Sequence, residues 1–374
     1  MAFPLSPARR ARACLTALAV VLSLCAPHGT AQAAKPRPKA TAKHQAPAKE
    51  RLTGIPYAGR ADAMLAADDI AARRDLDRAW VRQAIGNARM LPQITRWVLP
   101  PPAGTAKNWR IYRSRFIDPV RIAAGVAFWQ AHAATLERAE REFGVPAATI
   151  VGIVGVETIY GRNVGNFRVM DALATLSFDF PDAHPRASER RVFFQNELEQ
   201  LLSLAKRSGI EPLSLRGSYA GAMGLPQFMP SSWARYAIDF DGDGRVDLFR
   251  SPADVIGSVA NYFKAFGWQP GMATHYPVQF DSTRLDLEAL LAPDILPTFS
   301  AKSLADKGVL LDAAGQHHAG PLALVELQNG SAPAAYIAGT ENFYAITRYN
   351  WSSYYAMAVI ELGQAVAREV KNKP

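Results

Sequence analysis

Glu157 stands at the end of a strongly apolar stretch. In IVGIVGVETIYGR it follows seven residues that have no polar side chain. Burial disfavours the charged form of a carboxylate and raises its pKa, so such a glutamate can hold a proton near neutral pH and donate it. This is the character of a glycosidase general acid. The alternative is a helix-terminal glutamate that forms an ion pair with Arg162 or Arg168.

A glycine-rich segment, GSYAGAMGLPQFMPSSW, has the composition of a binding loop. Glycine allows the backbone to pass close to a bulky polar ligand such as a sugar chain. The polar side chains of Ser218, Tyr219 and Gln227 stand among the small residues. A tight turn before a helix capped by Ser231 or Ser232 explains part of this pattern. It does not explain why Gln227 is combined with a run of glycine and alanine.

Alternating aspartates in DFDGDGRVDLFRSPAD predict a cation site. Asp239, Asp241, Asp243 and Gly244 follow the first half of an EF-hand calcium loop, in which Arg245 would contribute only its backbone carbonyl. Like charges repel at this spacing, so a cation is needed to hold the carboxylates together. We therefore expect a structural calcium ion in this loop.

The second half of the loop departs from the EF-hand pattern. Its twelfth position, where a bidentate glutamate is expected, is Arg250. Asp254 is the residue best placed to supply the missing ligand. Asp254 is also suited to be the N3 capping residue of a helix that begins at Ser251, and Asp247 is suited to be a solvated side chain.

Helices must position these residues, and the sequence marks their ends clearly. Asp118 and Pro119 predict the start of a helix that continues to Phe143 and stops at Gly144. Pro146 opens the next helix, which carries the apolar stretch. Further helices are expected at residues 188–207, 251–267 and 352–371. Short strands are expected at residues 322–328 and 334–338, on either side of an Asn-Gly hairpin signal.

The overall composition is that of a globular protein, with 374 residues of which 49% are hydrophobic and 20% charged. The net charge of +9 arises mostly in residues 1–50, which contain eight basic residues and one acidic residue. Residues 51–374 carry 34 basic and 32 acidic residues, which makes nucleic acid a poor candidate for a partner. Residues 34–58, which begin with a stretch rich in Lys, Pro and Ala, are expected to be a disordered tether.

The first residues indicate export. Three arginines precede an apolar run over residues 13–26, which is shorter than the ~20 apolar residues of a membrane span, and residues 1–33 are expected to be a signal peptide. Both cysteines, Cys14 and Cys25, lie in this signal, so the mature chain would have no disulfide or thiolate site. Cys25 resembles a lipidation site, but Leu24 replaces the small residue that normally precedes it, so a lipid anchor is the less favoured expectation.

Six segments together resemble the membrane-bound lytic murein transglycosylase B family, including its soluble forms. They are VGIVGVETIYGR, DALATLSFDFP, GSYAGAMGLPQFMPSSW, DFDGDGRVDL, IGSVANYFKAFGW and FYAITRYN, and the resemblance extends from about Arg60 to the C-terminus. It implies a mainly α fold (α+β), with a lysozyme-like catalytic core beside an accessory helical domain and a small β-containing domain. The implied boundaries are 59–135 for the helical domain, 136–272 for the core with its EF-hand-like loop, 273–340 for the β-containing insertion and 341–374 for a segment that completes the core.

The resemblance also implies an activity. The family cleaves the β-1,4 bond between N-acetylmuramic acid and N-acetylglucosamine in peptidoglycan without water, and leaves a 1,6-anhydromuramic acid end. Its single catalytic glutamate corresponds to Glu157, and no cofactor takes part in catalysis. By the same correspondence the substrate-binding residues are Ser218, Gln227, Tyr219, Tyr112, Arg190, Arg191, Tyr349, Asn350 and Tyr355, and the calcium ligands are Asp239, Asp241, Asp243, the Arg245 carbonyl and Asp254.

The sequence is consistent with a cleavage mechanism that uses a single carboxylate. A conventional glycosidase needs two carboxyl groups, about 5 Å or about 6.5–9.5 Å apart, whereas Asp171 is expected to be an N-cap and Asp179 lies in an aromatic loop. Glu157 would protonate the glycosidic oxygen, and the sugar's own 2-acetamido group would stabilise the anomeric cation. Glu157 as a base would then activate the C6 hydroxyl.

Two other functions stay open at this point. A water-using muramidase on the same core is motivated by Asp179 and Asp182 near the cleft. A non-catalytic, calcium-stabilised wall-binding protein would not need Glu157. The expected partners are peptidoglycan glycan strands and, beyond them, other cell-wall enzymes. The expected location is the periplasm, and attachment to the outer membrane would require lipidation of Cys25.

Overall fold

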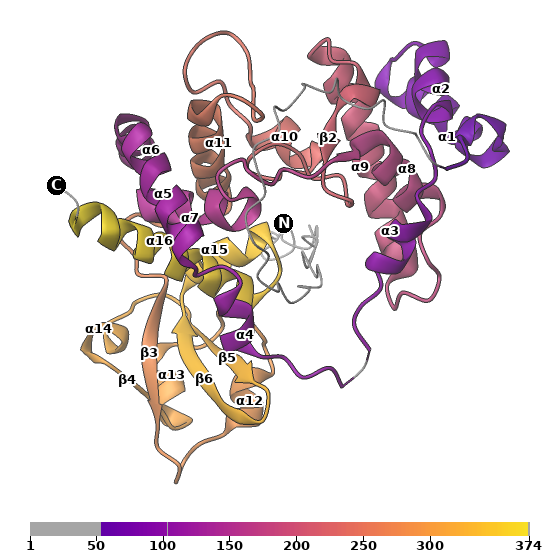
Figure 1. Ribbon diagram of the computed structural model, residues 1–374. Helices are drawn as coiled ribbons and strands as arrows, with labels where there is room; N and C mark the ends of the chain where they lie inside the picture. The colour runs from indigo at the N-terminus through magenta and orange to yellow at the C-terminus, as the bar shows by residue number, and fades with distance from the viewer. Residues whose placement is uncertain (1–53, 103, 373–374) are drawn as a thin grey trace, which may run out of the picture.

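The computed structural model describes residues 54–102 and 104–372, which form a mainly helical fold with few strands (Figure 1). The predicted signal peptide, most of the predicted tether, and both cysteines lie outside the described residues. Within the described ranges, none of the helices has the length and apolar character that a bilayer crossing requires. The mainly α fold class that the sequence predicts is confirmed.

One group of helices combines two distant parts of the sequence. Its members are α1 (Ala61–Arg74), α2 (Arg78–Gly86), α3 (Pro92–Trp97), α8 (Val169–Phe178) and α9 (Ala187–Arg207). α8 packs against α9, and α2 and α3 pack against α8 (right side of Figure 1). Arg73 and Arg74 of α1 form ion pairs with Glu199 of α9 at 2.7 and 2.5 Å. These contacts hold the first helices of the described chain on the α8–α9 pair.

A second group is built around α7, the helix that carries Glu157. Its members are α4 (Trp109–Ser114), α5 (Pro119–Ala131), α6 (Ala133–Phe143), α7 (Ala147–Thr158), α10 (Pro230–Tyr236), α11 (Pro252–Ala265), α15 (Glu341–Tyr349) and α16 (Ser353–Asn372). α7 contacts α5, α6, α11 and, most extensively, α16. Apart from Ala148 and Glu157, every residue of α7 is buried. A helix that is apolar on all sides is stable only when other helices surround it in this way.

The two groups share one hydrophobic core, and α10 contacts both α9 and α11. The predicted helical domain of residues 59–135 is therefore not one packing unit. Its first helices belong to the α8–α9 group, whereas α4 and α5 pack against α16. The apolar faces of these helices are covered by helices that are distant in the sequence. Domain boundaries predicted as continuous residue ranges therefore do not separate the two groups.

The predicted helix over residues 119–143 is broken at His132. Asp118 caps α5 as expected, because its carboxylate accepts a hydrogen bond from Arg121 N at 2.9 Å. Gly144 ends α6 with a left-handed backbone (φ 70°), also as expected. His132 leaves the helical conformation (φ −126°, ψ 24°). After this break, α5 packs against α16 and α6 packs against α11. A single straight helix would not fit against both of these partners.

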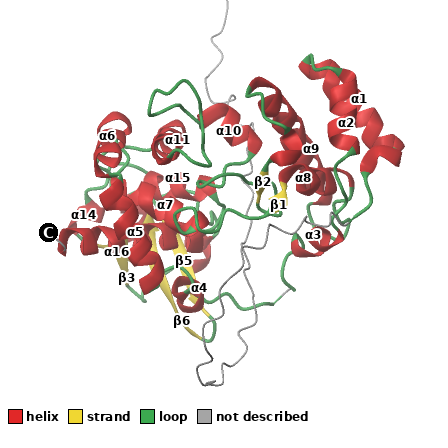
Figure 2. Cartoon of the chain, turned by 45° about the horizontal axis from the view of Figure 1, so that its top comes forward, coloured by secondary structure: helices red, strands yellow, loops and turns green. Residues whose placement is uncertain are grey.

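The β-containing insertion has its own small core. Its four-stranded antiparallel sheet has the order β4–β3–β6–β5, and short helices pack against it (lower part of Figure 1). In Figure 2 the strands β3, β5 and β6 are drawn in yellow. The elements are β3 (His275–Phe280), α12 (Leu287–Leu291), α13 (Ala301–Asp306), β4 (Val309–Leu311), α14 (Ala313–Gln316), β5 (Ala323–Asn329) and β6 (Ala332–Gly339). The predicted hairpin at Asn329 and Gly330 is confirmed, because β5 pairs with β6 across that turn.

Two glycines allow the backbones of α7 and α16 to touch. A Cβ atom on Gly152 would lie 2.3 Å from the carbonyl oxygen of Val359, and a Cβ atom on Gly363 would lie 2.0 Å from that of Ala148. Any larger residue would have to push the helices apart in a close-packed interior. The antiparallel approach brings the first turns of α16 beside the last turn of α7.

We expect Gly363→Ala to lower the free energy of unfolding by about 1–3 kcal/mol, because the added methyl group must displace a helix backbone. Urea unfolding followed by circular dichroism measures this loss. Gly59→Ala is the matched control, since no atom lies within 4 Å of the added carbon, and it should change stability by less than about 0.5 kcal/mol. Equal stability of Gly363→Ala and the wild type would contradict backbone contact between α7 and α16.

Candidate active site

Glu157 occupies the last turn of α7, and Tyr355 of α16 donates a hydrogen bond to its Oε1. The helix ends directly after the glutamate, because Ile159 and Tyr160 both adopt the left-handed conformation (φ 52° and 55°). A β-branched residue is a rare occupant of this region. Backbone outliers of this kind cluster at functional sites. The end of the apolar helix is therefore the first candidate for the catalytic centre.

Burial raises the pKa of Glu157 to about 7, and the hydrogen bond from Tyr355 opposes this shift in part. The carboxyl group can therefore hold a proton at neutral pH and release it easily, as a general acid and base must. In the described part of the chain Glu157 has no ion pair. Arg168, one of the two alternative partners, instead binds Asp171 at 2.5 Å.

Aromatic side chains surround the pair of Glu157 and Tyr355. Tyr349, the last residue of α15, stacks on Tyr355 with ring centroids 6.4 Å apart and an interplanar angle of 16°. Its hydroxyl donates to Pro226 O at 2.5 Å. Burial and, to a smaller extent, the negative charge of Glu157 raise the pKa of Tyr112 of α4. The same charge contributes to the raised pKa of Tyr349 and of Tyr355, which places all three rings near the carboxylate.

The glycine-rich segment, residues 217–233, is fastened to the loop that follows α7. Gln227 has a left-handed backbone (φ 51°), and its side-chain nitrogen donates to Val164 O at 3.1 Å. Thr158, the last residue of α7, donates from its hydroxyl to Leu225 O at 2.9 Å. These two hydrogen bonds hold the predicted binding segment against the end of the helix that carries the carboxylate.

Ser218 and Tyr219 begin this segment. Ser218 is buried, and its hydroxyl oxygen accepts hydrogen bonds from the backbone N–H groups of Ala220 and Ala222 at 3.3 and 3.0 Å. The Ser218 hydroxyl therefore shapes the turn of its own segment, and the sugar contact expected of it stays a prediction. The ring of Tyr219 lies beside Trp97 of α3, with centroids 5.7 Å apart.

The helix after the glycine-rich segment is capped from another element. The predicted cap by Ser231 or Ser232 is wrong, because α10 begins at Pro230 and its N-cap residue is Met229, which makes no side-chain cap. Instead the carboxylate of Glu197 in α9 accepts from Ser231 N at 2.8 Å and from Ser231 Oγ at 2.6 Å. A carboxylate at this place satisfies free N–H groups of the helix and favours its dipole.

Three further predicted substrate-binding residues are Arg190, Arg191 and Asn350. Arg190 of α9 is only 9% exposed, and burial lowers the pKa of its guanidinium. Arg191 donates to Asp182 at 2.7 Å. Asn350 is the C-cap residue of α15, directly after Tyr349. Both arginines lie in α9, and Arg191 bonds to Phe180 O and Asp182 in the loop before that helix. The part of both arginines in substrate binding stays a prediction.

The other carboxylates of the region have partners of their own. Asp171 is not an N-cap, because Arg168 holds that position and Asp171 is the third residue of α8, where it binds the Arg168 guanidinium. Asp179 pairs with Arg60 at 2.6 Å. The side chain of Asp182 is 92% exposed. None of these three carboxylates contributes to the pKa of Glu157.

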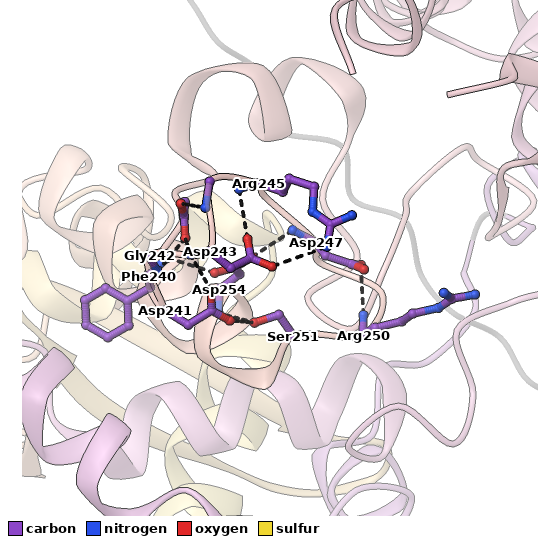
Figure 3. Close-up of polar contacts among 11 residues, drawn as sticks. Phe240, Asp241, Gly242, Asp243, Arg245, Asp247, Arg250, Ser251 and Asp254 are labelled. Atoms are coloured by element: carbon purple, nitrogen blue, oxygen red, sulfur yellow. Dashed lines mark hydrogen bonds and ion pairs between the residues drawn. The ribbon is translucent and has the colours of Figure 1, made fainter. Parts of the chain in front are cut away.

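The acidic loop between α10 and α11 gathers three carboxylates, of which Asp241 and Asp254 are labelled in Figure 3. Oxygens of Asp239, Asp241 and Asp254 lie within 4.8 Å of one another. Asp254 is only 1% exposed, burial raises its pKa, and its two oxygens accept from Phe240 N at 2.8 Å and Asp247 N at 2.7 Å. Carboxylates held this close together are suited to a cation that prefers oxygen ligands.

One predicted carboxylate ligand, Asp243, is not part of this acidic group. The Asp243 carboxylate accepts from Arg245 N at 2.9 Å and pairs with the Arg245 guanidinium at 3.5 Å.

Asp254 combines the two roles that the sequence left open. It belongs to the acidic group, and it is the N3 residue of α11, where its N–H donates to the cap Ser251 at 3.2 Å.

The sequence matches the family model described as the transglycosylase SLT domain over residues 60–364. It is 39% identical over 331 residues to membrane-bound lytic murein transglycosylase B of Escherichia coli K12, with 84% of this chain and 85% of the relative covered. The chain belongs to the lytic murein transglycosylase B family. It is thus a peptidoglycan lytic transglycosylase.

Solved structures of lytic transglycosylases agree in fold. Catenated SltB1 from Pseudomonas aeruginosa superimposes with a TM-score of 0.75 at 40% identity, over 84% of this chain and 99% of that one. Slt35 of Escherichia coli in complex with calcium superimposes with a TM-score of 0.72 at 38% identity, over 85% of this chain and 96% of that one. The lysozyme-like core expected from the sequence is confirmed.

Two residues near Glu157 and Tyr355 in this transglycosylase were not predicted from the sequence. Tyr262 of α11 has its ring centroid 4.8 Å from that of Tyr349 and donates to Arg348 O at 2.7 Å. Arg121 of α5 donates to Gly155 O, inside α7, at 3.1 Å. Tyr262 belongs to IGSVANYFKAFGW, so a signal for it was present. Arg121 carries no such signal, because an arginine in an amphipathic helix is usually solvated.

In this lytic transglycosylase we expect Tyr355→Phe to raise the pKa of Glu157, because the lost hydrogen bond stabilises the ionised carboxylate. The general-acid role expected of Glu157 predicts that the wild-type rate falls as the pH rises through about 7. In the variant this fall should move to higher pH by up to about one unit, the equivalent of one hydrogen bond. The pH dependence of kcat/KM on soluble peptidoglycan fragments measures the shift.

Tyr354→Phe is the matched control for this experiment. The Tyr354 hydroxyl donates to Gln328 O at 2.9 Å and not to the carboxylate, so the pH profile of this variant should follow the wild type. A shift of the Tyr355→Phe profile to lower pH would contradict the role given to the hydrogen bond.

Proposed function

We propose that Glu157 acts alone, first as an acid and then as a base, on the β-1,4 bond between N-acetylmuramic acid and N-acetylglucosamine. One observation carries this proposal. The pKa of about 7 arises from burial and from the Tyr355 hydrogen bond, with no contribution from another carboxylate in the described residues. A second acid about 5 Å or about 6.5–9.5 Å away, as a conventional glycosidase has, would perturb this pKa.

The proposed reaction begins with the protonated acid. The proton passes from Glu157 to the glycosidic oxygen while the bond between that oxygen and C1 breaks, which frees the 4-hydroxyl of N-acetylglucosamine. The 2-acetamido carbonyl of the muramic sugar stabilises the cation at C1. Glu157, now a carboxylate, takes the proton of the C6 hydroxyl as O6 bonds to C1. The 1,6-anhydro ring is closed, the acid is restored, and no water is consumed.

Tyr355 stabilises the ionised carboxylate of Glu157 that forms between the two steps of the proposed reaction. Burial raises the pKa of its hydroxyl well above the ordinary range, so the hydroxyl keeps its proton. It donates that proton in a hydrogen bond to Glu157, and a preset donor stabilises the carboxylate as soon as it forms. The glutamate can then act as a base in the second step.

For the substrate, we infer that the glycan lies between the aromatic residues and the glycine-rich segment. The side-chain nitrogen of Gln227 already donates to Val164 O and Gly224 O, which leaves its carbonyl oxygen to accept from sugar N–H and O–H groups. The remaining contacts are assigned to Ser218, Tyr219, Tyr112, Tyr349, Asn350 and Tyr355. Arg190 and Arg191 would bind carboxylates of the stem peptide.

We also propose a structural calcium ion in the acidic loop. Asp239, Asp241 and Asp254 offer three carboxylates within 4.8 Å of one another, and calcium prefers such oxygen ligands. The Arg245 carbonyl and, after rotation of its side chain, Asp243 would complete the ligand set. Slt35, a relative, was solved in complex with calcium. The ion would stabilise the loop between α10 and α11 and would take no part in bond cleavage.

The two alternative functions are less favoured. A muramidase would need a second carboxylate for water, but Asp179 is held by Arg60 at 2.6 Å and by the Tyr57 hydroxyl at 2.5 Å. Asp182 is exposed and binds Arg191. A wall-binding protein without catalysis would have no reason to keep a carboxyl group desolvated, because this arrangement costs stability.

For the location, we propose that the enzyme is exported by residues 1–33 and acts in the periplasm. A lipid anchor on Cys25 remains the second option. The name of the Escherichia coli relative, membrane-bound lytic murein transglycosylase B, supports it, whereas Leu24 before the cysteine weighs against it. Other cell-wall enzymes are proposed as further partners.

We expect Glu157→Gln to lower kcat on peptidoglycan by about 10²–10⁴-fold, because the amide provides no proton. Binding to insoluble peptidoglycan should persist, since the shape of the side chain is kept. Mass spectrometry of wild-type digests should find 1,6-anhydromuramic acid ends. Glu142→Gln is the matched control, because Glu142 lies in an exposed ion pair with Arg138, and its rate should equal that of the wild type.

Two results would contradict the proposed chemistry. Reducing-end muramic acid in place of the anhydro form would mean that water is the nucleophile. Cleavage by Glu157→Gln at a rate close to that of the wild type would mean that another residue is the acid.

We expect removal of calcium to lower the thermal midpoint of unfolding. An ion present at 100 times its Kd stabilises the fold by about 2.7 kcal/mol, which calorimetry with and without a chelator measures. Asp254→Asn should lose the response to calcium. Asp306→Asn, which changes an exposed partner of Lys302, should keep it. The same midpoint for the wild type in calcium and in chelator would argue against the ion.

A further inference from the structure

Trp97 is a large aromatic residue that is 52% exposed, at the end of α3. Single exposed apolar residues are common on protein surfaces and carry no argument by themselves. One of its two aromatic neighbours, Tyr219, belongs to the glycine-rich segment, and the other, Phe167, lies in the strand that pairs with the start of that segment. Its ring centroid lies 5.7 Å from that of Tyr219 and 5.8 Å from that of Phe167.

Both contacts connect Trp97 to the start of the glycine-rich segment. Phe167 is in β1 (Phe167–Arg168), which pairs with β2 (Arg216–Gly217) and places Phe167 opposite Gly217. The two residues after Gly217 are Ser218 and Tyr219. Trp97 therefore contacts Phe167 of this strand pair and Tyr219, the third residue of the glycine-rich segment. It extends the same surface outward from the proposed glycan site.

The indole is held in place by its neighbours. It meets Tyr219 and Phe167 edge to face, with interplanar angles of 79° and 82°. α3 itself packs on α8, and Leu91 N donates to Thr175 Oγ1 of α8 at 3.0 Å. A ring that is already fixed loses little conformational freedom when a ligand stacks on it, so little of the binding energy is lost to ordering.

We propose that Trp97 and Tyr219 form an aromatic subsite that binds a sugar ring of the glycan strand at a distance from the bond being cleaved. This inference rests on the proposed function of the site beside it. A pyranose ring presents C–H groups on its face and hydroxyl groups on its rim. Trp and Tyr match this pattern with an apolar ring and a polar atom at its edge.

A glycan fits this surface better than a protein or a lipid bilayer does. A stable protein partner covers about 800 Å² on each side, whereas Trp97 is the only exposed large apolar residue of α3, β1 and the glycine-rich segment. A bilayer surface likewise requires a broad apolar face. A single indole ring is enough to stack on one sugar ring. A glycan strand that extends beyond the glycine-rich segment would meet Tyr219 and then Trp97.

The test measures binding in the Glu157→Gln background, where strands are not cut. We expect Trp97→Ala to weaken the binding of long glycan strands by about two- to tenfold, the range of one aromatic stacking contact. A short fragment that spans only the cleaved bond should lose less affinity. Trp97→Phe should restore most of the binding, and Trp97→Leu should not. Leu65→Ala is the matched control, because Leu65 is 65% exposed on α1 and should not affect either ligand.

Three results would overturn the subsite. If Trp97→Ala binds long strands as well as the wild type does, Trp97 makes no contact with the glycan. If long and short ligands lose the same affinity, the effect is indirect and acts through Tyr219. If Trp97→Leu keeps the wild-type affinity, any apolar side chain suffices. Failure of the proposed function has a different signature, because then the unmodified enzyme would leave no anhydro ends on peptidoglycan.

Discussion

The contact between the backbones of α7 and α16 governs the rest of the site. At Gly152 and Gly363 the two helices approach so closely that neither can shift without a clash or a void. This fit holds the first turns of α16 over the last turn of α7, and it desolvates Glu157. The raised pKa of the carboxyl group is therefore a result of helix packing, and no charged neighbour is needed to produce it.

Hydrogen bonds at the edge of the α7–α16 pair fix the positions of the neighbouring segments. Thr158 and Gln227 join the end of α7 to the glycine-rich segment, and Tyr349 joins α15 to the same segment. Tyr219 continues the surface to Trp97 on the other group of helices. A small displacement of α7 would consequently disturb both the proposed acid and the proposed glycan-binding surface.

Interactions between residues close in sequence could be predicted from the sequence. Asp118 as an N-cap and Gly144 as a helix end depend on one turn of chain, and both agree with the structure. The break at His132, the cap by Glu197 and the position of Tyr262 depend on contacts between distant elements. No pattern along the chain encodes those contacts, because they depend on which apolar faces meet.

The candidate site shows the same division. The apolar stretch before Glu157 indicated a raised pKa, since burial follows from local composition. The hydrogen bond from Tyr355 could not be predicted, although both residues had been singled out. In the acidic loop, spacing suggested Asp254 correctly as a member of the group. Spacing could not reveal that the Asp243 carboxylate lies against Arg245 instead.

The distance of 198 residues between Glu157 and Tyr355 has a consequence for the timing of activity. Before α16 docks on α7, the carboxyl group is in water, where its ordinary pKa of 4.5 leaves it ionised at neutral pH. Such a chain has neither a proton to donate nor a donor to support the charge. A partly folded chain would therefore lack the acid proposed for bond cleavage, which forms only when α16 packs on α7.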